Sequence, residues 1–335
     1  RSNDLVTKVM DAGAAGIVIV TMEGQANFDR IANRYKSMAG NGRIGFDQEI
    51  KQRPVFMVSS DKMAQLFGAS VETLKEAAKT NPETIASQKA SYQIVKTKTP
   101  VDAVNVMGFL EGTDKKEEIV VLTAHYDHIG VSADGQINNG ANDDGSGTVT
   151  VMELAEAFGK AAAEGKRPRR SILFMTVTGE EKGLLGSEWY ANHPLFPLKN
   201  TVVDLNTDMT GRYDDEHKGK PDYIYEIGSD KLSSQLREVL IEQNKKHVGL
   251  ELDFRFNDPN DPNRFYYRSD HYNFAKHGIP VAFFFNGVHD DYHMPGDEVD
   301  KIEFDQIQKV GRLVFYMAWE IANREQRLVV DSNKP

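Results

Sequence analysis

The sequence predicts an α/β fold with a mostly parallel central sheet covered by helices on both faces, plus a small α/β segment. Three observations predict it. Short, β-branched apolar runs alternate with longer runs of helical periodicity. The strand-like runs are apolar throughout, as in strands buried on both faces. Clusters of His, Asp and Glu directly follow several of these runs, where parallel sheets bind ligands.

The first part of the chain is predicted to form the small α/β segment. Strands are expected at residues 15–20 and 54–58, and helices at 5–10, from Asp61 onward and at 71–78. Ser60 is expected to cap the second of these helices. A polar stretch at residues 80–84 contains Pro82 and predicts a boundary, which divides the chain into residues 1–85 and 86–335.

The larger domain alternates strands with helices. Alternating patterns at 91–96 and 101–110 predict two antiparallel strands joined across Thr99-Pro100. Further strands are expected at 118–124, 171–177, 202–206, 223–227 and 279–285. Helices are expected at 147–163, from Gly186, at 230–247, after a Ser269 cap and at 304–323. This alternation predicts the parallel sheet.

Composition excludes several classes of function. The 335 residues carry 40 Lys and Arg against 50 Asp and Glu, a net charge of −10, so we expect no nucleic acid and no membrane surface as partner. Without cysteine, any metal must be held by His, Asp and Glu. We find no apolar run of the roughly 20 residues that a membrane span needs, and we expect no signal peptide. The abrupt start at Arg1 is expected to be a processed or truncated end.

The stretch from Val120 to Gly147 carries the clearest chemical signal. A buried strand runs into His125-Tyr126-Asp127-His128, and after a Gly- and Asn-rich loop Asn142-Asp143-Asp144 opens a helix. Imidazole supplies a neutral nitrogen ligand and carboxylate supplies charge, so this pairing suits a divalent metal.

Five side chains at consecutive strand ends are candidate metal ligands. They are His125, Asp143, Glu181, Asp208 and His293. One zinc could use three of them and leave a position open for water. Two zinc ions need one bridging carboxylate and two further ligands each, which uses all five. The count favours a two-metal site.

The motifs AHYDHIG, GANDDGSGT, TGEEKGLLGS, LNTDM and DYHMPGDE occur in this order. From about residue 90 onward the chain therefore resembles the co-catalytic zinc exopeptidases, the family of aminopeptidase Y and the bacterial leucyl-type aminopeptidases. The resemblance implies that Asp143 bridges two zinc ions, with His125 and Asp208 completing one and Glu181 and His293 the other.

The resemblance also implies roles for neighbouring residues. Glu180 would be the general base, Asp127 would accept a hydrogen bond from the His125 ring, and Tyr292 would hydrogen-bond the oxyanion. A cis peptide bond is expected between Asp143 and Asp144. The motifs GAAGIVIV and RPVFMVSS resemble the later half of a protease-associated domain.

The expected function is that of an aminopeptidase acting on peptides with a free N-terminus, and family habit implies an extracytoplasmic location. A carboxypeptidase or dipeptidase would need a cation such as Arg264 or Arg268 for the substrate carboxylate. A glutaminyl cyclase would work with a single zinc. A binding module that has lost catalysis is disfavoured by the intact ligand set and Glu180. The oligomeric state is not predicted.

Several polar residues receive a structural interpretation. His128 is expected to support a ligand or simply to pack. Ser269-Asp270-His271 resembles a helix cap, and Asp297 is expected to support the turn that carries His293. The acidic loop at 257–263 lacks EF-hand spacing and is expected to be a hydrated loop.

Overall fold

The chain forms two compact units, Arg1–Pro100 and Val101–Pro335. The computed structural model describes residues 2–21, 24–40, 44–47, 53–87, 89, 91, 93, 95, 97–132 and 134–332. The division falls after Pro100, so residues 86–100, which the sequence analysis assigns to the larger domain, lie in the first unit.

The first unit is a small α/β structure, as predicted. Strands β1 (Ile17–Thr21) and β2 (Val55–Ser59) pair in parallel. The helices are α1 (Ser2–Asp11), α2 (Gly24–Gly40), α3 (Ser60–Phe67), α4 (Val71–Thr80) and the 3-10 turn η1 (Pro82–Thr84). The N-cap of α3 is Ser59, whose hydroxyl accepts a hydrogen bond from the N–H of Lys62 (3.2 Å). The predicted cap, Ser60, is instead the first residue of the helix.

The predicted pair of antiparallel strands on either side of Pro100 is wrong in the residues that the structure describes. Residues 92, 94 and 96 of the first predicted strand lie outside the described residues. Residues 97–105 form no strand, and β3 (Val106–Leu110) pairs antiparallel with a much later strand, β7 (Arg170–Val177).

Among the described residues of the second unit, seven strands form one sheet in the order β10-β9-β11-β8-β4-β7-β3. The remaining strands of this sheet are β4 (Lys115–His125), β8 (Thr201–Thr207), β9 (Tyr223–Ile227), β10 (Glu251–Asp253) and β11 (Val281–Phe285). The central strands β11, β8, β4 and β7 are mutually parallel, whereas β9 runs antiparallel to β11. A separate hairpin joins β5 (Gly130–Val131) to β6 (Ile137–Asn138).

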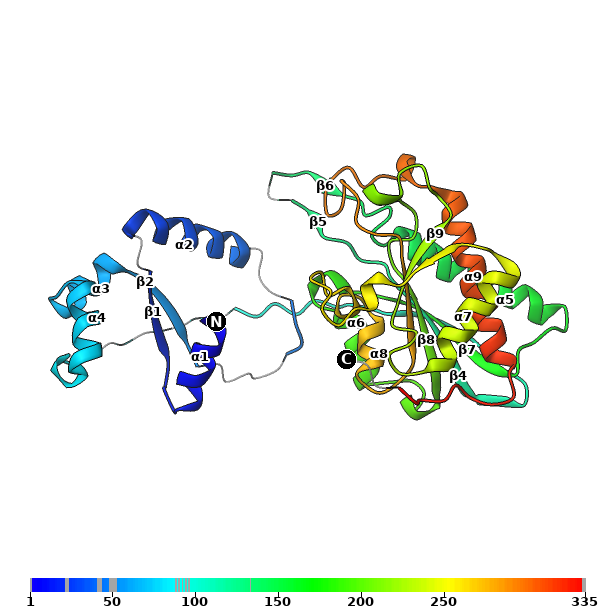
Figure 1. The fold of residues 1–335 in the computed structure, drawn as a ribbon, viewed down its shortest axis with the longest axis horizontal. Coiled ribbons are helices and arrows are strands. Elements are labelled where there is room, and N and C mark those ends of the chain that lie inside the picture. Colours follow the sequence, from blue (N-terminus) through cyan, green and yellow to red (C-terminus); the bar gives the residue numbers. More distant parts are fainter. Residues whose placement is uncertain are drawn as a thin grey trace. The chain divides into compact units, whose positions relative to one another are not determined.

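Helices cover both faces of this sheet (Figure 1), which confirms the predicted fold class. On one face lie α5 (Gly145–Ala163), α7 (Ser234–His247) and α9 (Phe304–Asn323), and on the other α6 (Leu185–Asn192) and α8 (His271–Ala275). Short 3-10 turns complete the unit: η2 (Glu180–Lys182), η3 (Leu198–Asn200), η4 (Asp215–His217), η5 (Arg255–Asn257), η6 (Phe265–Tyr267) and η7 (Val299–Lys301). No helix of the described residues is long and apolar enough to span a bilayer.

Strand β4 explains why the predicted strands read as apolar throughout. Val120 and Leu122 pack in the core under α5 and α9, while Ile119 and Val121 pack in the core under α6 and α8. Because successive side chains point to opposite faces, a strand covered on both sides is mostly apolar. The buried hydroxyl of Thr123 is the exception on β4, and it donates a hydrogen bond to Asp204 on β8 (2.8 Å). Each apolar side chain contributes about 1.5–3 kcal/mol when buried. The run ends where polar chemistry begins, at His125.

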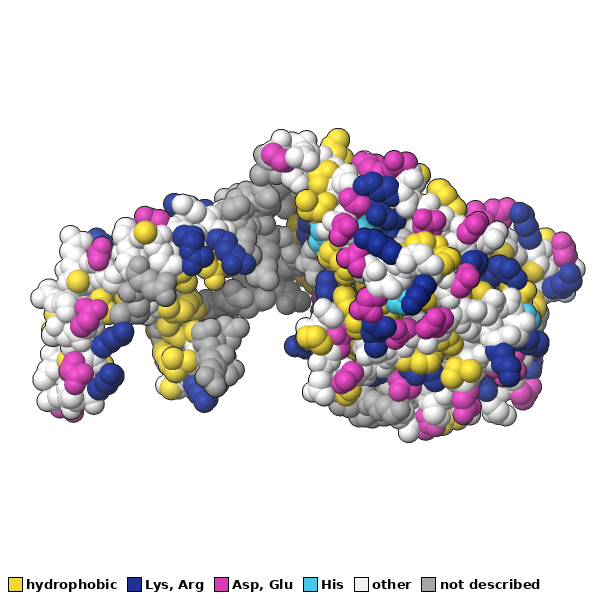
Figure 2. Space-filling view, turned by 45° about the horizontal axis from the view of Figure 1, so that its top comes forward, with side chains coloured by type: hydrophobic (Ala, Val, Ile, Leu, Met, Phe, Trp, Pro, Cys, Tyr) yellow, Lys and Arg dark blue, Asp and Glu magenta, His cyan; other side chains and the backbone are white. Residues whose placement is uncertain are grey.

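On the face of the second unit that Figure 2 shows, acidic and basic side chains lie interspersed. Several charged residues of this unit pair directly, including Arg212 with Asp291 (3.0 Å) and Lys301 with the same carboxylate (2.9 Å).

Candidate metal centre

The parallel sheet brings the predicted ligands to one edge. His125 is the last residue of β4, Asp208 follows the end of β8, and Glu181 lies in η2, just beyond β7. Asp143 precedes α5, and His293 lies in the loop after β11. Since the carboxyl ends of parallel strands meet at the same edge, residues far apart in sequence become neighbours.

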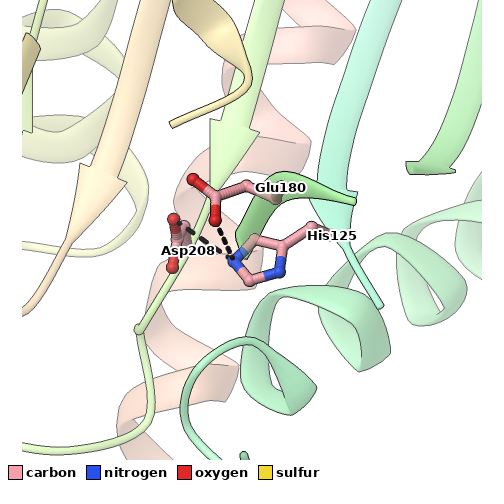
Figure 3. Close-up of side chains that lie close together, drawn as sticks. All are labelled: His125, Glu180 and Asp208. Atoms are coloured by element: carbon pink, nitrogen blue, oxygen red, sulfur yellow. Dashed lines mark ion pairs between the residues drawn. The ribbon is translucent and has the colours of Figure 1, made fainter. Parts of the chain in front are cut away.

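On one side of the centre, which we call the Asp208 side, His125 lies close to the carboxylates of Asp143 and Asp208. Its Nε2 lies 3.3 Å from Asp143 Oδ1 and 3.6 Å from Asp208 Oδ2. Glu180 Oε2 is 3.9 Å from the same nitrogen. Figure 3 shows His125, Glu180 and Asp208 converging on one point. The His125 side chain is 1% exposed, so these charges interact in a dry environment.

On the other side, which we call the Glu181 side, the partner is His293. Its Nε2 lies 3.0 Å from Asp143 Oδ2 and 3.2 Å from Glu181 Oε2. Asp143 therefore presents one carboxylate oxygen to each histidine. This is the arrangement expected of a carboxylate that bridges two positions.

The donor atoms fit a divalent cation. His125 Nε2, Asp143 Oδ2, Glu181 Oε1 and Asp208 Oδ1 are buried and make no hydrogen bond. Leaving a buried polar group unpaired costs about 1–3 kcal/mol, so such a cluster calls for a ligand. Two atoms bound at roughly 2.0–2.2 Å to one zinc-like ion lie about 3–3.6 Å apart. The N–O distances from His125 and His293 to Asp143, Asp208 and Glu181 run from 3.0 to 3.6 Å.

Their surroundings shift the pKa values of the two adjacent glutamates in opposite directions. Burial, with the charge of Asp208, raises the pKa of Glu180 well above its usual value, although His125 opposes the shift. Burial acts in the same direction on Glu181, but the imidazoles of His128 and His293 outweigh it and lower its pKa. Glu180 is thus the more basic of the two carboxylates, whereas Glu181 favours the ionised form that binds a cation.

Asp127 supports the centre in a different way from the one predicted. The Nδ1–H of His125 donates to the main-chain oxygen of Asp127 (3.0 Å), while the Asp127 carboxylate lies 3.8 Å away. That carboxylate instead accepts hydrogen bonds from the main-chain N–H groups of Glu180 (3.1 Å) and Glu181 (3.4 Å). The tautomer of His125 is therefore set by a carbonyl, and the Asp127 side chain positions the two glutamates.

The carboxylate of Asp144 links the start of α5 to the ends of β4 and β8 by hydrogen bonds, a role that the sequence did not predict. Its Oδ1 accepts from the N–H groups of Gly147 (2.8 Å) and Met209 (3.1 Å), and its Oδ2 accepts from the N–H of His125 (3.2 Å). It caps α5 and ties that helix to the ends of β4 and β8. The predicted cis peptide bond between Asp143 and Asp144 is confirmed.

Two further polar residues form hydrogen bonds that position candidate metal ligands, and the sequence did not predict these contacts. Ser269 does not cap α8, which begins without a side-chain cap; its hydroxyl donates to Asp208 Oδ2 (2.8 Å). The carboxylate of Asp297 accepts from the N–H groups of Asn142 (3.0 Å) and Asp143 (3.1 Å), so it supports the Asp143 loop where support of the His293 turn was expected. Both stand in short polar motifs, but only the fold identifies their partners.

The remaining predicted residues lie around this centre. Tyr292 stacks on His293 (centroids 3.9 Å apart), and its hydroxyl oxygen accepts a hydrogen bond from Arg268 (3.1 Å). His271 is buried and stacks on Phe283, which fits the structural interpretation. His128 lies with its Nδ1 3.0 Å from Glu181 Oε1.

The fold and the centre together define an α/β protein with a candidate metal centre at the carboxyl edge of its sheet. The profile of peptidase family M28 matches residues 105–318, and the chain belongs to this family. The resemblance to zinc exopeptidases that the motifs indicated is thereby confirmed at the level of the family.

Relatives of known name agree with this assignment. The chain is 28% identical over 273 residues to aminopeptidase YwaD of Bacillus subtilis, covering 74% of this chain and 51% of YwaD. It is 30% identical over 215 residues to a probable leucine aminopeptidase of Arthroderma otae, covering 62% and 55% of the two chains. The chain thus spans about half the length of these curated relatives.

Solved structures show the same fold. BSAP, a zinc aminopeptidase from Bacillus subtilis, is 28% identical with a TM-score of 0.51, covering 66% of this chain and 50% of that chain. The aminopeptidase from Aneurinibacillus sp. strain AM-1 is 25% identical with a TM-score of 0.51, covering 69% and 51%.

Proposed function

We propose that this chain is a zinc-dependent aminopeptidase whose centre holds two zinc ions bridged by Asp143. The observation that carries the proposal is the carboxylate of Asp143, which places Oδ1 3.3 Å from His125 Nε2 and Oδ2 3.0 Å from His293 Nε2. Relatives named aminopeptidase and zinc aminopeptidase support the activity and the metal.

The residues of the centre have separate roles in the proposed hydrolysis of the peptide bond. Zinc supplies a Lewis acid that activates water and polarises the scissile carbonyl. Glu180 takes a proton from the attacking water and returns it to the leaving amine, a task that suits a buried carboxyl of raised pKa. The hydroxyl of Tyr292 donates a hydrogen bond to the developing oxyanion, because its oxygen already accepts one from Arg268.

We propose a peptide with a free N-terminus as substrate. Asp143, Glu180, Glu181 and Asp208 surround the reaction site, and a substrate ammonium group would find carboxylates there. A peptide with a blocked N-terminus offers no such charge. Aminoacyl anilides with free and acetylated amines therefore test the direction of cleavage, and zinc content separates this enzyme from a single-zinc cyclase.

The Glu180→Gln variant tests the proposed base. We expect kcat on a free aminoacyl anilide to fall by about 10²–10⁴-fold, the contribution of a general base, while two zinc ions per chain remain bound. Glu242→Gln, an exposed substitution on α7, is the matched control and should keep full activity. Normal turnover by Glu180→Gln would contradict the assignment.

We also propose an extracytoplasmic location, which rests on the family resemblance alone. Fractionation of the native host, followed by immunodetection of the chain, tests it. Recovery in the cytoplasmic fraction would contradict it.

A further inference from the structure

One arginine lies beside the candidate metal centre. Arg268 directly follows η6, and its exposed side chain places the guanidinium against two aromatic residues. Nη2 donates a hydrogen bond to the hydroxyl oxygen of Tyr292 (3.1 Å), and Cζ lies 4.9 Å from the centre of the Phe265 ring. The ring of Tyr292 stacks on His293, a candidate ligand, with centroids 3.9 Å apart. A single side chain therefore separates the charge of Arg268 from the centre.

Short contacts hold the main chain on both sides of Arg268. Its own N–H donates to the main-chain oxygen of Phe265 (3.0 Å). The next residue, Ser269, is buried, and its hydroxyl donates to Asp208 Oδ2 (2.8 Å). Because this neighbouring side chain contacts a candidate ligand, the base of the Arg268 side chain is fixed beside the centre. A residue supported in this way is preorganised for binding.

The guanidinium of Arg268 has no carboxylate partner within 4 Å among the residues that the structure describes, although carboxylates dominate the centre beside it. Arg212 and Lys301, by contrast, both pair with Asp291. A guanidinium carries five N–H donors, and the hydroxyl of Tyr292 accepts from one of them. The planar arrangement of these donors matches a carboxylate, so the remaining ones can bind a carboxylate of another molecule.

The proposed reaction places a substrate between these opposite charges. Its ammonium group lies among the carboxylates of the centre, and the hydroxyl of Tyr292 donates to the oxyanion on the scissile carbonyl. In a dipeptide, three covalent bonds separate that carbonyl carbon from the carboxylate carbon of the leaving residue, so the two carbons lie within about 4 Å of each other. Arg268 Nη2 lies 3.1 Å from the Tyr292 oxygen and can therefore reach such a carboxylate.

We propose that Arg268 binds a carboxylate on the residue that follows the scissile bond and so determines which leaving residues the enzyme prefers. This inference rests on the proposed aminopeptidase function. The C-terminal carboxylate of a dipeptide fits the short reach best, and an Asp or Glu side chain on the leaving residue offers the same chemistry. Arg268 is a specificity-determining residue in this site, and the proton transfers remain with Glu180.

Two pairs of substrates, all with leucine as the first residue, test the assignment and distinguish the two sources of the carboxylate. Leucylglycine and leucylglycinamide differ in the C-terminal carboxylate. The α-amides of leucylglutamate and leucylglutamine differ in the side-chain carboxylate. We expect the wild type to favour the charged member of the first pair by about 10–100-fold in kcat/KM, the range that a hydrogen bond to a charged group supplies.

Arg268→Gln should remove most of this preference, and Arg268→Lys, which keeps the charge but loses the planar donors, should retain part of it. A lower kcat on every substrate, caused by the lost hydrogen bond to Tyr292, cancels in the ratio within one pair. Arg264→Gln is the matched control, because Arg264 is also exposed and lies over an aromatic ring, that of Tyr267 (4.7 Å). It should keep the wild-type ratio.

A wild type that hydrolyses leucyl anilide but favours the charged member of neither pair would overturn the assignment, and this comparison needs no variant to fold. Unchanged ratios in Arg268→Gln, or loss of the preference in Arg264→Gln alone, would also overturn it. A preference confined to the glutamate pair and lost in Arg268→Gln would support the assignment, with the side-chain carboxylate as the group that is bound. A wild type that hydrolyses neither these peptides nor any aminoacyl anilide would contradict the aminopeptidase itself.

Discussion

At the scale of single residues, two neighbouring aspartates with the same side chain do different work. Asp143 turns both carboxylate oxygens toward histidines, while Asp144 accepts three main-chain hydrogen bonds. The adjacent Glu180 and Glu181 divide in the same way, since their surroundings shift their pKa values in opposite directions. The residue type indicates that a side chain could bind a metal. The environment of each oxygen determines whether it binds a cation, accepts hydrogen bonds or transfers a proton.

Tyr292→Phe tests the proposed oxyanion donor. Because Arg268 donates to the hydroxyl oxygen (3.1 Å), the hydroxyl proton is free to face the substrate. We expect kcat to fall by about 10²–10³-fold, with zinc content unchanged and a smaller effect on KM. Tyr316→Phe, which alters a ring on α9 stacked on His247, should retain the wild-type kcat. Equal kcat values for Tyr292→Phe and the wild type would exclude this role.

At the scale of elements, the start of α5 approaches the end of β8 more closely than a side chain allows. A Cβ at Gly147 would lie 2.2 Å from the main-chain oxygen of Thr207. This contact keeps Asp143 and Asp208 on the same small area, because one precedes α5 and the other follows β8. Helix and strand are therefore docked by a position that tolerates only glycine.

Two alanine substitutions in the same helix should have opposite effects. Gly147→Ala must push α5 from β8 and should lower the free energy of unfolding by about 1–3 kcal/mol or more. Gly159→Ala meets nothing within 4 Å and should raise it by about 0.8–1 kcal/mol, the difference in helix propensity. Urea unfolding monitored by circular dichroism measures both. The same change for both variants would show that docking at Gly147 is unimportant.

Strand β9 carries a buried acid that links stability to pH. Burial raises the pKa of Glu226 from 4.5 to about 7, against the opposing effect of Arg237. Between these values the folded chain holds a proton that the unfolded chain releases, so this group's contribution to stability falls as pH rises from about 4.5 to 7. The contribution is on the order of 3 kcal/mol.

Glu226→Gln should remove that part of the pH dependence. We expect its free energy of unfolding to vary less than that of the wild type between pH 5 and 7, with the two chains differing most near neutral pH. Chemical unfolding at several pH values measures it, and the exposed Glu242→Gln should keep the wild-type slope. A Glu226→Gln slope equal to that of the wild type would refute the linkage.

At the scale of the whole molecule, the net charge of −10 includes carboxylates gathered at one sheet edge. A cation bound there should stabilise the second unit, by about 4 kcal/mol when zinc is in roughly 1,000-fold excess over its dissociation constant. For a unit of this size that corresponds to a rise in Tm of about 10 °C.

Calorimetry with chelator and with zinc measures this effect. The transition of the second unit should move to higher temperature with zinc, and the transition of the first unit should stay, because the clusters of candidate ligands within the described residues lie in the second unit. Calcium, which prefers sites built from oxygen ligands, should not reproduce the shift. A second unit equally stable with chelator and with zinc would contradict a metal centre.

The sequence by itself determined the α/β class, most of the strands and helices and the five candidate ligands. Periodicity carries this information because a strand covered on both faces is apolar at most positions and an amphipathic helix repeats about every 3.6 residues. The final helix was predicted at Phe304–Asn323, where it lies. Residues 101–105 were misjudged because an alternating pattern does not reveal whether a partner strand exists.

Only the tertiary structure decided which polar groups meet. Ser269 reaches Asp208, Asp297 holds the loop of Asp143, and His128 faces Glu181 across many intervening residues. Local patterns describe the period of a segment, whereas these contacts depend on the order of strands in the sheet and on loops that meet at its edge. Hydrogen bonds and ligand positions are short-range and directional, so they are settled only when the packed elements bring the atoms within about 3 Å.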